Sequence, residues 1–431
     1  MLIAFVGYIN KKYALFLVCM LGLVSKFFML DRTKEAVGVI RGSDMALILI
    51  LGLLPIVYSK NKALFSIRGD TLTRWTYIFL SFYVIELIIT VIIGRESLFN
   101  SLKVIRVPFF MCGFFVLRAI PIKSYQKFFK IALWITLIQS VLFSLQFIGI
   151  KMISGERDVF ENADYYITNI PTLTVLFLFL LWKFEHLGKK RIFLIAFLLA
   201  VVLSSYVRGT IIAILLGGAY YTAFISRRKR RFMTIILLLL VIPLALKFIN
   251  KKAEITGASH KNFEEIEHVF NQRNNMENIS SEDGTFSFRI AMLYERIDWL
   301  MNNPQHLLTG VGTLHEDSHN TLKMFDFSLG TNNEDRFYGK TIIESGDIAW
   351  VPIALRYGLI GIFIHIMMFF LLFNVTRQRK DLLEMLSAYA IVVFLRTFDG
   401  AYFETPELIY IHTLLFAILS RANIENKPVL M

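Results

Sequence analysis

Apolar runs of membrane-spanning length fill most of this chain, and they constrain its fold more than any other feature. A helix needs about 20 predominantly apolar residues to cross the hydrocarbon core of a bilayer. Of the 431 residues, 56% are hydrophobic, and the mean hydropathy is +0.58. A water-soluble chain of this length is far more polar. The sequence therefore predicts an all-α integral membrane protein.

The candidate transmembrane helices number about 12. Lys26 interrupts the first, and the candidate at 347–375 is long enough to tilt strongly or to break near Gly358 and Gly361. The candidates lie near residues 13–31, 44–59, 74–93, 104–120, 127–148, 168–185, 191–206, 208–226, 232–249, 347–375, 382–398 and 406–421.

One long polar stretch, residues 250–346, interrupts this pattern. It divides the chain into an N-terminal membrane domain at 1–249 with about nine spans, a large loop at 250–346, and C-terminal spans at 347–431. Polar residues gathered on one face of a multi-span protein indicate that its chemistry takes place on that face. We expect the loop to carry short helices and the functional residues.

Lysine and arginine residues in alternate connectors set the predicted orientation, because connectors rich in these residues face the cytoplasm. Both termini are then cytoplasmic. The polar stretch 250–346 lies on the extracytoplasmic side, together with 150–167 and 399–405. The basic connectors contain Lys11/Lys12, Lys60/Lys62/Arg68/Arg74, Lys123/Lys127/Lys130, Lys189/Lys190/Arg191, Arg227 to Arg231 and Arg377/Arg379/Lys380.

The net charge of +13 does not point to nucleic acid, because these basic residues sit in short connectors where they orient the spans. Membrane lipid is the expected partner of such residues. The only cysteines, Cys19 and Cys112, fall in apolar runs without metal-like spacing. We expect no disulfide, no zinc site and no cofactor.

Within the polar stretch, an amphipathic helix is predicted from Phe286 to Met301, where apolar residues recur at helical spacing. Arg289 and Arg296, seven residues apart, would share one edge of the apolar stripe. Such a helix suits the membrane interface, and its planar guanidinium groups match the oxygens of a lipid-linked phosphate or pyrophosphate. The alternatives are a solvated spacer and ordinary snorkelling to anionic lipids.

Arg208 stands in the break between two apolar runs, at the predicted extracytoplasmic mouth of the spans. An arginine held in hydrocarbon costs roughly 2.5–3.5 kcal/mol, so it either snorkels or faces a polar cavity. Arg106, Arg356 and Arg396 lie in or beside spans and face the same choice. Several inward-facing arginines would favour a strongly anionic ligand.

Four separated pieces of the sequence together resemble the O-antigen ligase and O-antigen polymerase superfamily. Their order, intervals and shared membrane side carry the resemblance, which covers roughly residues 190–375. The pieces are Tyr206-Val207-Arg208-Gly209; Arg289 followed by Pro304 and Gly310-Val311-Gly312; His319-Asn320-Thr321-Leu322; and Arg356-Tyr357-Gly358-Leu359-Ile360-Gly361.

This resemblance implies a helical membrane fold of the GT-C-like polymerase and ligase type in the bacterial cytoplasmic membrane. It implies an inverting, metal-independent glycosyltransferase that acts outside that membrane on an oligosaccharide linked to undecaprenyl pyrophosphate. A pyrophosphate leaving group needs its developing charge neutralised, and Arg208 and Arg289 are the candidates. A chain-length regulator protein is a further partner that such an activity admits.

The catalytic base that the resemblance suggests is His319, because a weak hydroxyl nucleophile benefits from a positioned imidazole. In the family's pattern, however, the His-Asn pair stands closer to the Gly-Leu-Ile-Gly element than His319 stands to Gly361, and at that interval this chain has Asp347. Either the loop carries an insertion after His319, or Asp347 takes the place of the histidine. His315 is a third candidate.

Polymerase and ligase share the fold, the donor and the arginine pattern, and differ in the acceptor. The idiosyncratic loop favours a polymerase of polysaccharide repeat units over a ligase that transfers glycan to lipid A core. A lipid-linked oligosaccharide flippase is the competing class, although flippases usually have short connectors on both sides. A non-enzymatic scaffold would not need Arg208 and Arg289 together.

Overall fold

The protein is helical throughout the part that the computed structural model describes. That part comprises residues 1–25, 41–67, 70–145, 170–184, 187–205, 207–225, 285–325, 327, 342–344, 348–379, 381–398, 400 and 402–425. These residues form no strand, only one isolated bridge between Ile348 and Gly400. The prediction of an all-α membrane protein with several apolar spans is confirmed.

The helices follow one another along the chain with short connectors. They are α1 (Leu2–Ile9), α2 (Tyr13–Val24), α4 (Gly42–Lys60), α5 (Thr71–Ile92), α6 (Leu98–Ile105), α7 (Gly113–Arg118), α8 (Ile122–Leu145), α9 (Leu173–Leu180), α10 (Lys190–Ser204), α11 (Arg208–Tyr220), α14 (Thr285–Asn302), α15 (Pro304–Leu307), α16 (His319–Met324), α17 (Trp350–Arg377), α18 (Met385–Arg396) and α19 (Pro406–Glu425).

Five of the described helices, α4, α5, α8, α17 and α19, are long and apolar enough to cross a membrane. A sixth span is formed if α6 is counted with Pro108–Arg118, which is bent from it by 61°. The bend lies where the ring of Pro108 removes a backbone donor and crowds the preceding turn. The predicted span at 104–120 is therefore broken. The predicted span at 232–249 lies outside the described residues, and a total of about 12 stays a prediction.

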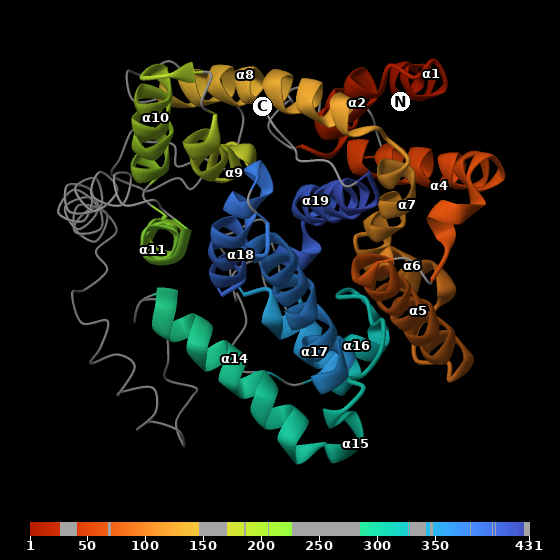
Figure 1. Ribbon diagram of the computed structural model, residues 1–431. Coiled ribbons are helices and arrows are strands. Elements are labelled where there is room, and N and C mark those ends of the chain that lie inside the picture. The colour runs from red at the N-terminus through yellow and green to blue at the C-terminus, as the bar shows by residue number, and fades with distance from the viewer. Residues whose placement is uncertain are drawn as a thin grey trace.

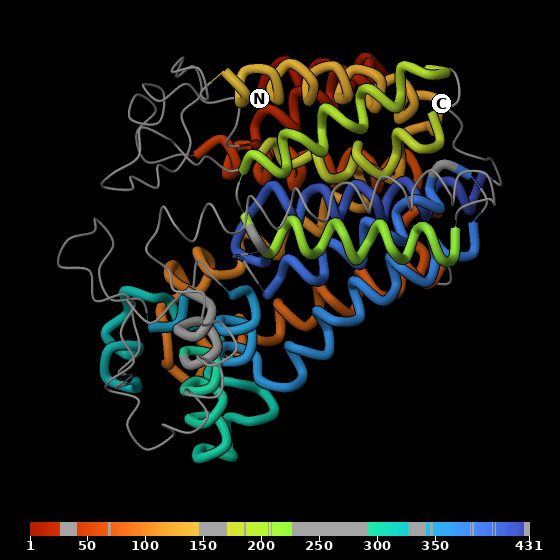
Figure 2. The backbone as a smooth tube through the Cα atoms, turned by 90° about the vertical axis from the view of Figure 1, so that its left-hand side faces the viewer, coloured from red at the N-terminus to blue at the C-terminus, as the bar shows by residue number. Residues whose placement is uncertain are grey.

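The C-terminal helices lie at the centre of the bundle. Figure 1 shows α17, α18 and α19 in blue, with α4, α8, α10 and α11 around them. In α19, 78% of the most apolar 18-residue window is buried, more than in any other described span. Figure 2 shows the long helices running from one end of the bundle to the other, with α14, α15 and α16 gathered at one end.

Connectors that the charge pattern predicts on one side of the membrane do lie together. At the predicted cytoplasmic end, Lys183 pairs with Glu384 at 2.6 Å and Arg118 with Asp70 at 3.9 Å. At the opposite end, Arg106 pairs with Asp44 at 3.5 Å, the Arg95 Nη1 donates to the Val311 carbonyl at 3.2 Å, and the Ala349 amide donates to the Thr397 carbonyl at 3.0 Å. Which end faces the cytoplasm stays a prediction.

Helix α17 breaks at Gly358, as the sequence predicts. Gly358 has φ 58° and ψ −155°, so the backbone leaves the helix there and resumes it afterwards. Two carbonyls of the broken turn, those of Leu355 and Arg356, accept hydrogen bonds from the amides of Val311 (2.9 Å) and Gly312 (2.8 Å). Irregular backbone at membrane depth persists only where other protein groups satisfy it. The loop before α16 supplies those groups.

The contact between Gly310–Gly312 and the break at Leu355–Ile360 forms what we call the glycine interlock, because it needs glycine on both sides. Gly310 has φ 68°, and a Cβ there would lie 2.3–2.4 Å from the backbone of Arg356 and Tyr357. A Cβ on Gly358 would lie 2.6 Å from the carbonyls of Leu307 and Leu308. The Ile360 amide also donates to the Leu308 carbonyl at 3.1 Å. Only residues without a side chain let these backbones meet.

Gly310→Ala is expected to destabilise the fold by at least about 2 kcal/mol, because it adds both a positive-φ strain and a backbone clash. Thermal unfolding of the purified protein in detergent measures the effect. Gly52→Ala in α4 is the matched control, since no atom lies within 4 Å of its added Cβ. Equal melting temperatures for the two variants would contradict the interlock.

Candidate functional site

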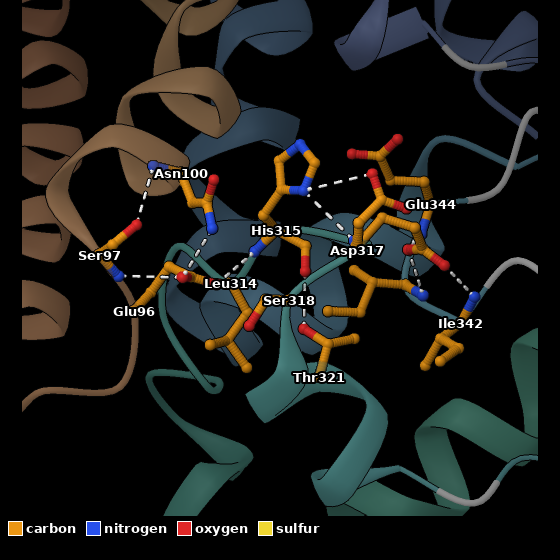
Figure 3. Close-up of polar contacts among 12 residues, drawn as sticks. Glu96, Ser97, Asn100, Leu314, His315, Asp317, Ser318, Thr321, Ile342 and Glu344 are labelled. Atoms are coloured by element: carbon orange, nitrogen blue, oxygen red, sulfur yellow. Dashed lines mark hydrogen bonds and ion pairs between the residues drawn. The ribbon is translucent and has the colours of Figure 1, made fainter.

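The loop that follows the glycine interlock returns to the end of α5. The Thr313 amide donates to the Thr90 Oγ1 at 3.0 Å, and the His315 amide donates to the Glu96 carboxylate at 3.3 Å. Figure 3 shows Glu96 accepting further hydrogen bonds from the Ser97 amide (2.9 Å) and the Asn100 side chain (3.1 Å). Burial acts to raise the pKa of Glu96, but these hydrogen bonds and one from Ser318 together lower it. Glu96 is therefore held as an acceptor that fixes the loop to the bundle.

His319 is the first residue of α16, and its side chain is exposed at this end of the bundle. Ser318 precedes it as the N-cap and accepts from the Asn320 amide at 3.2 Å. The Asn320 side chain donates to the Arg95 carbonyl. These contacts fix the backbone of the His-Asn pair, while the imidazole of His319 makes no hydrogen bond to a described residue. The ring is thus open to a substrate.

His315 is less suited to accept a proton. Its Nδ1 already accepts a hydrogen bond from the Asp317 amide at 3.2 Å, and the Asp317 carboxylate lies 3.8 Å away (Figure 3). A neutral ring with Nδ1 as acceptor carries its proton on Nε2. This geometry favours His319 over His315 as the histidine that could act as base.

Arg356, at the broken turn of α17, faces neither lipid nor an open cavity. Its side chain is only 4% exposed, and its Nε donates to the Leu314 carbonyl at 2.9 Å. Its two terminal nitrogens lie 3.0 Å from the Glu344 carboxylate and 3.6 Å from the Glu404 carboxylate. The arginine therefore ties the loop, the segment before α17 and the connector before α19 into one cluster.

The predicted helix in the polar stretch is present as α14, but its buried face differs from the expected one. Met292, Arg296 and Leu300 point inward, whereas Ile297 and Met301 are exposed. Sequence spacing placed Arg296 at an edge because it cannot tell which of two adjacent faces the rest of the loop covers.

Arg296 is 0% exposed, and several protein groups compensate its buried charge. Its guanidinium lies 4.3 Å from the Phe327 ring centroid, pairs with Glu295, and donates to the Ile342 carbonyl at 3.4 Å. Burial lowers the pKa of Arg296 to about 10, against the opposing effect of Glu295 and Glu316. The expected headgroup position is not observed, and a pyrophosphate role for Arg296 stays a prediction.

The remaining predicted site residues are placed only in part. Arg208 begins α11 and Arg289 lies in α14, but their side chains are outside the described part of the structure. Asp347 also lies outside it, between the described residues Glu344 and Ile348. The structure therefore brings His319 to the interlocked end without testing the arginines or Asp347.

The sequence analysis missed the contribution of α5. Its Tyr83 hydroxyl bonds to the His365 Nε2 at 2.8 Å, and the His365 Nδ1 bonds to the Gly361 carbonyl at 2.7 Å. One turn further along α5, Glu86 is buried on the same side. A lone carboxylate inside an apolar run was the available signal, since ionisable residues within spans face the protein interior.

The acid pair around Arg356 gives a testable pH dependence. Burial raises the pKa of Glu404 to about 8, with Arg356 opposing and Glu344 and Glu316 reinforcing the shift. The fold thus favours the protonated carboxyl, so this group's stabilising contribution falls as the pH rises from the ordinary carboxyl range through about 8.

Glu404→Gln should remove that decline, because the amide stays neutral. Melting temperatures of wild type and variant, measured from pH 5 to pH 9, are expected to differ in slope, with the wild type losing more stability at high pH. Parallel curves would contradict the assignment of a protonated Glu404.

Comparison with known families bears on the same segment. Residues 192–366 match the family model described as O-Antigen ligase, a range that runs from α10 through the predicted loop into α17. It contains all the predicted site residues and both halves of the glycine interlock. No curated protein matches the chain significantly. The resemblance to the O-antigen ligase and polymerase superfamily is confirmed for this segment, and a ligase- or polymerase-type function is supported in general.

Proposed function

We propose that this protein, with its O-antigen ligase family segment at residues 192–366, is a polysaccharide repeat-unit polymerase. It would be an inverting, metal-independent glycosyltransferase that uses oligosaccharide linked to undecaprenyl pyrophosphate, at the extracytoplasmic face of the bacterial cytoplasmic membrane. The observation that carries the proposal is the glycine interlock. It joins two motifs of the family segment and leaves His319 exposed at the end where predicted extracytoplasmic connectors gather.

In the proposed reaction, a hydroxyl group of the acceptor sugar attacks the anomeric carbon of the donor from the side opposite the pyrophosphate. The new carbon–oxygen bond forms as the bond to the pyrophosphate oxygen breaks, and that oxygen keeps the electron pair. The base takes the hydroxyl proton. Configuration at the anomeric carbon is therefore inverted, and the products are the lengthened glycan and undecaprenyl pyrophosphate.

Arg208 and Arg289 are proposed to neutralise the charge that develops on the departing pyrophosphate. The other arginines of this end support that choice by their contacts. Arg356 is buried against two carboxylates and Arg296 against Glu295 and a carbonyl, so protein groups already use their charges. Fixed guanidinium groups stabilise such a transition state without reorganising when the reaction occurs.

His319 is the first candidate for the base and Asp347 the second. An exposed imidazole with a fixed backbone suits proton transfer near neutral pH. Asp347 keeps its candidacy through its interval to the Gly-Leu-Ile-Gly element. A ligase that transfers glycan to lipid A core is the second candidate function, because the matching family model carries the description of a ligase.

Transfer by the purified protein tests the proposal. The donor is undecaprenyl-pyrophosphate oligosaccharide in detergent, with EDTA present. Wild type is expected to give longer lipid-linked products. Arg208→Ala and Arg289→Ala should each lower kcat by about 10²- to 10³-fold, because each removes fixed positive charge from the leaving group. Of His319→Ala and Asp347→Ala, the one that removes the base should lose a comparable factor of about 10²- to 10⁴-fold.

Arg41→Ala is the matched control, because Arg41 is exposed on the same predicted side but outside the family segment. It should transfer at the wild-type rate. Products attached only to added lipid A core would replace the polymerase assignment with the ligase. No transfer to either acceptor by well-folded wild type, together with donor movement across proteoliposomes, would favour a flippase.

A further inference from the structure

The Glu316 carboxylate receives three consecutive backbone amides. Its Oε2 accepts from Ile343 at 2.8 Å and from Glu344 at 2.7 Å, and its Oε1 accepts from Ile342. Successive amides that converge on one anion form a charge-assisted nest. In an irregular segment without helix or strand, these bonds fix the backbone more strongly than neutral contacts would.

The partners of this carboxylate lie far apart in the sequence. Glu316 stands three residues before His319, whereas Glu344 stands three residues before Asp347. The contact thus closes the long stretch between the two sequence positions that compete for the role of base. An insertion after His319 and a functional Asp347 are then compatible, because the insertion begins and ends at the same place.

The segment at 342–344 is held from other directions as well. Arg296 donates to the Ile342 carbonyl at 3.4 Å, and Arg356 pairs with the Glu344 side chain at 3.0 Å. Ile342 and Ile343 are both buried. Of these supports, only Glu316 comes from the chain that leads directly into α16.

We propose that Glu316 is a positioning residue of the transferase site, which holds the segment of His319 in register with the segment that leads to Asp347. The proposal rests on the proposed function for its catalytic consequence. Its structural part, the nest at 342–344, stands independently. Glu316 itself does not contact substrate; it acts through the two segments that it joins.

Hydrogen exchange of the full-length protein in detergent tests the structural part. In Glu316→Ala, peptides that contain 342–344 should exchange at least about tenfold faster than in wild type. Peptides that contain Val311 and Gly312 should keep their protection, because their amides bond to α17 instead. Glu316→Gln keeps the side-chain shape and one acceptor oxygen, so it should show a smaller change at the same peptides.

The transfer assay tests the catalytic part. Glu316→Gln is expected to lower kcat by about 10- to 100-fold, with KM for the lipid-linked donor changed by less than about twofold, because misplaced groups slow the chemical step. Asp317→Asn is the matched control. Asp317 is the adjacent carboxylate, its side chain is 89% exposed, and the variant should keep wild-type kcat.

The two readouts separate the possible failures. Unchanged protection at 342–344 in Glu316→Ala would overturn the nest. Lost protection there with unchanged kcat, or with an equal rise in exchange at Val311 and Gly312, would overturn the positioning role. Lost protection confined to 342–344 in a protein whose wild type transfers nothing would contradict the proposed function and leave the nest supported.

Discussion

A helix that breaks inside a membrane protein leaves backbone carbonyls and amides that water cannot reach, and much of this structure depends on how α17 satisfies them. The turn that Gly358 interrupts receives the amides of Val311 and Gly312 and donates through Ile360 to the Leu308 carbonyl. Each hydrogen bond lost there would leave a buried polar group without its partner, at a cost of about 1–3 kcal/mol. The large loop is therefore part of the membrane bundle's own hydrogen bonding. This explains why the same motif fixes both the break and the path of the chain toward His319.

Charge completes what the backbone contacts begin. Arg356 lies at the break and holds the Glu344 and Glu404 carboxylates, while Glu316 binds the amides that precede Asp347. Removing one partner of a buried ion pair strands the other, so such a cluster is disrupted as a unit. Three connectors distant in sequence are thereby fixed at one end of the bundle. A site for an anionic, lipid-linked donor at this end would use arginines that the cluster does not already neutralise, which is the basis for assigning Arg208 and Arg289.

Hydropathy and charge patterns predicted the helical membrane class, the break near Gly358 and the helix now seen as α14, because each depends on local composition or spacing. Pro108 shows the limit, since its bend within a predicted span changes the count of spans. Arg296 shows another, because the buried face of α14 depends on packing against residues that follow far along the chain. Glu316 could not be recognised from sequence at all. Its role is defined by three amides whose positions only the fold determines.

The central claim is that the interlocked end of the bundle faces the outside of the cytoplasmic membrane. Single cysteines in a chain with Cys19 and Cys112 replaced by alanine test it, with a membrane-impermeant maleimide applied to spheroplasts. Lys323→Cys in α16 and Lys190→Cys at the start of α10 replace exposed residues at opposite ends. Labelling of position 323 in intact spheroplasts, with position 190 labelled only after permeabilisation, is the expected result. The reverse pattern would place the loop in the cytoplasm, away from an extracytoplasmic lipid-linked donor, and would contradict the account.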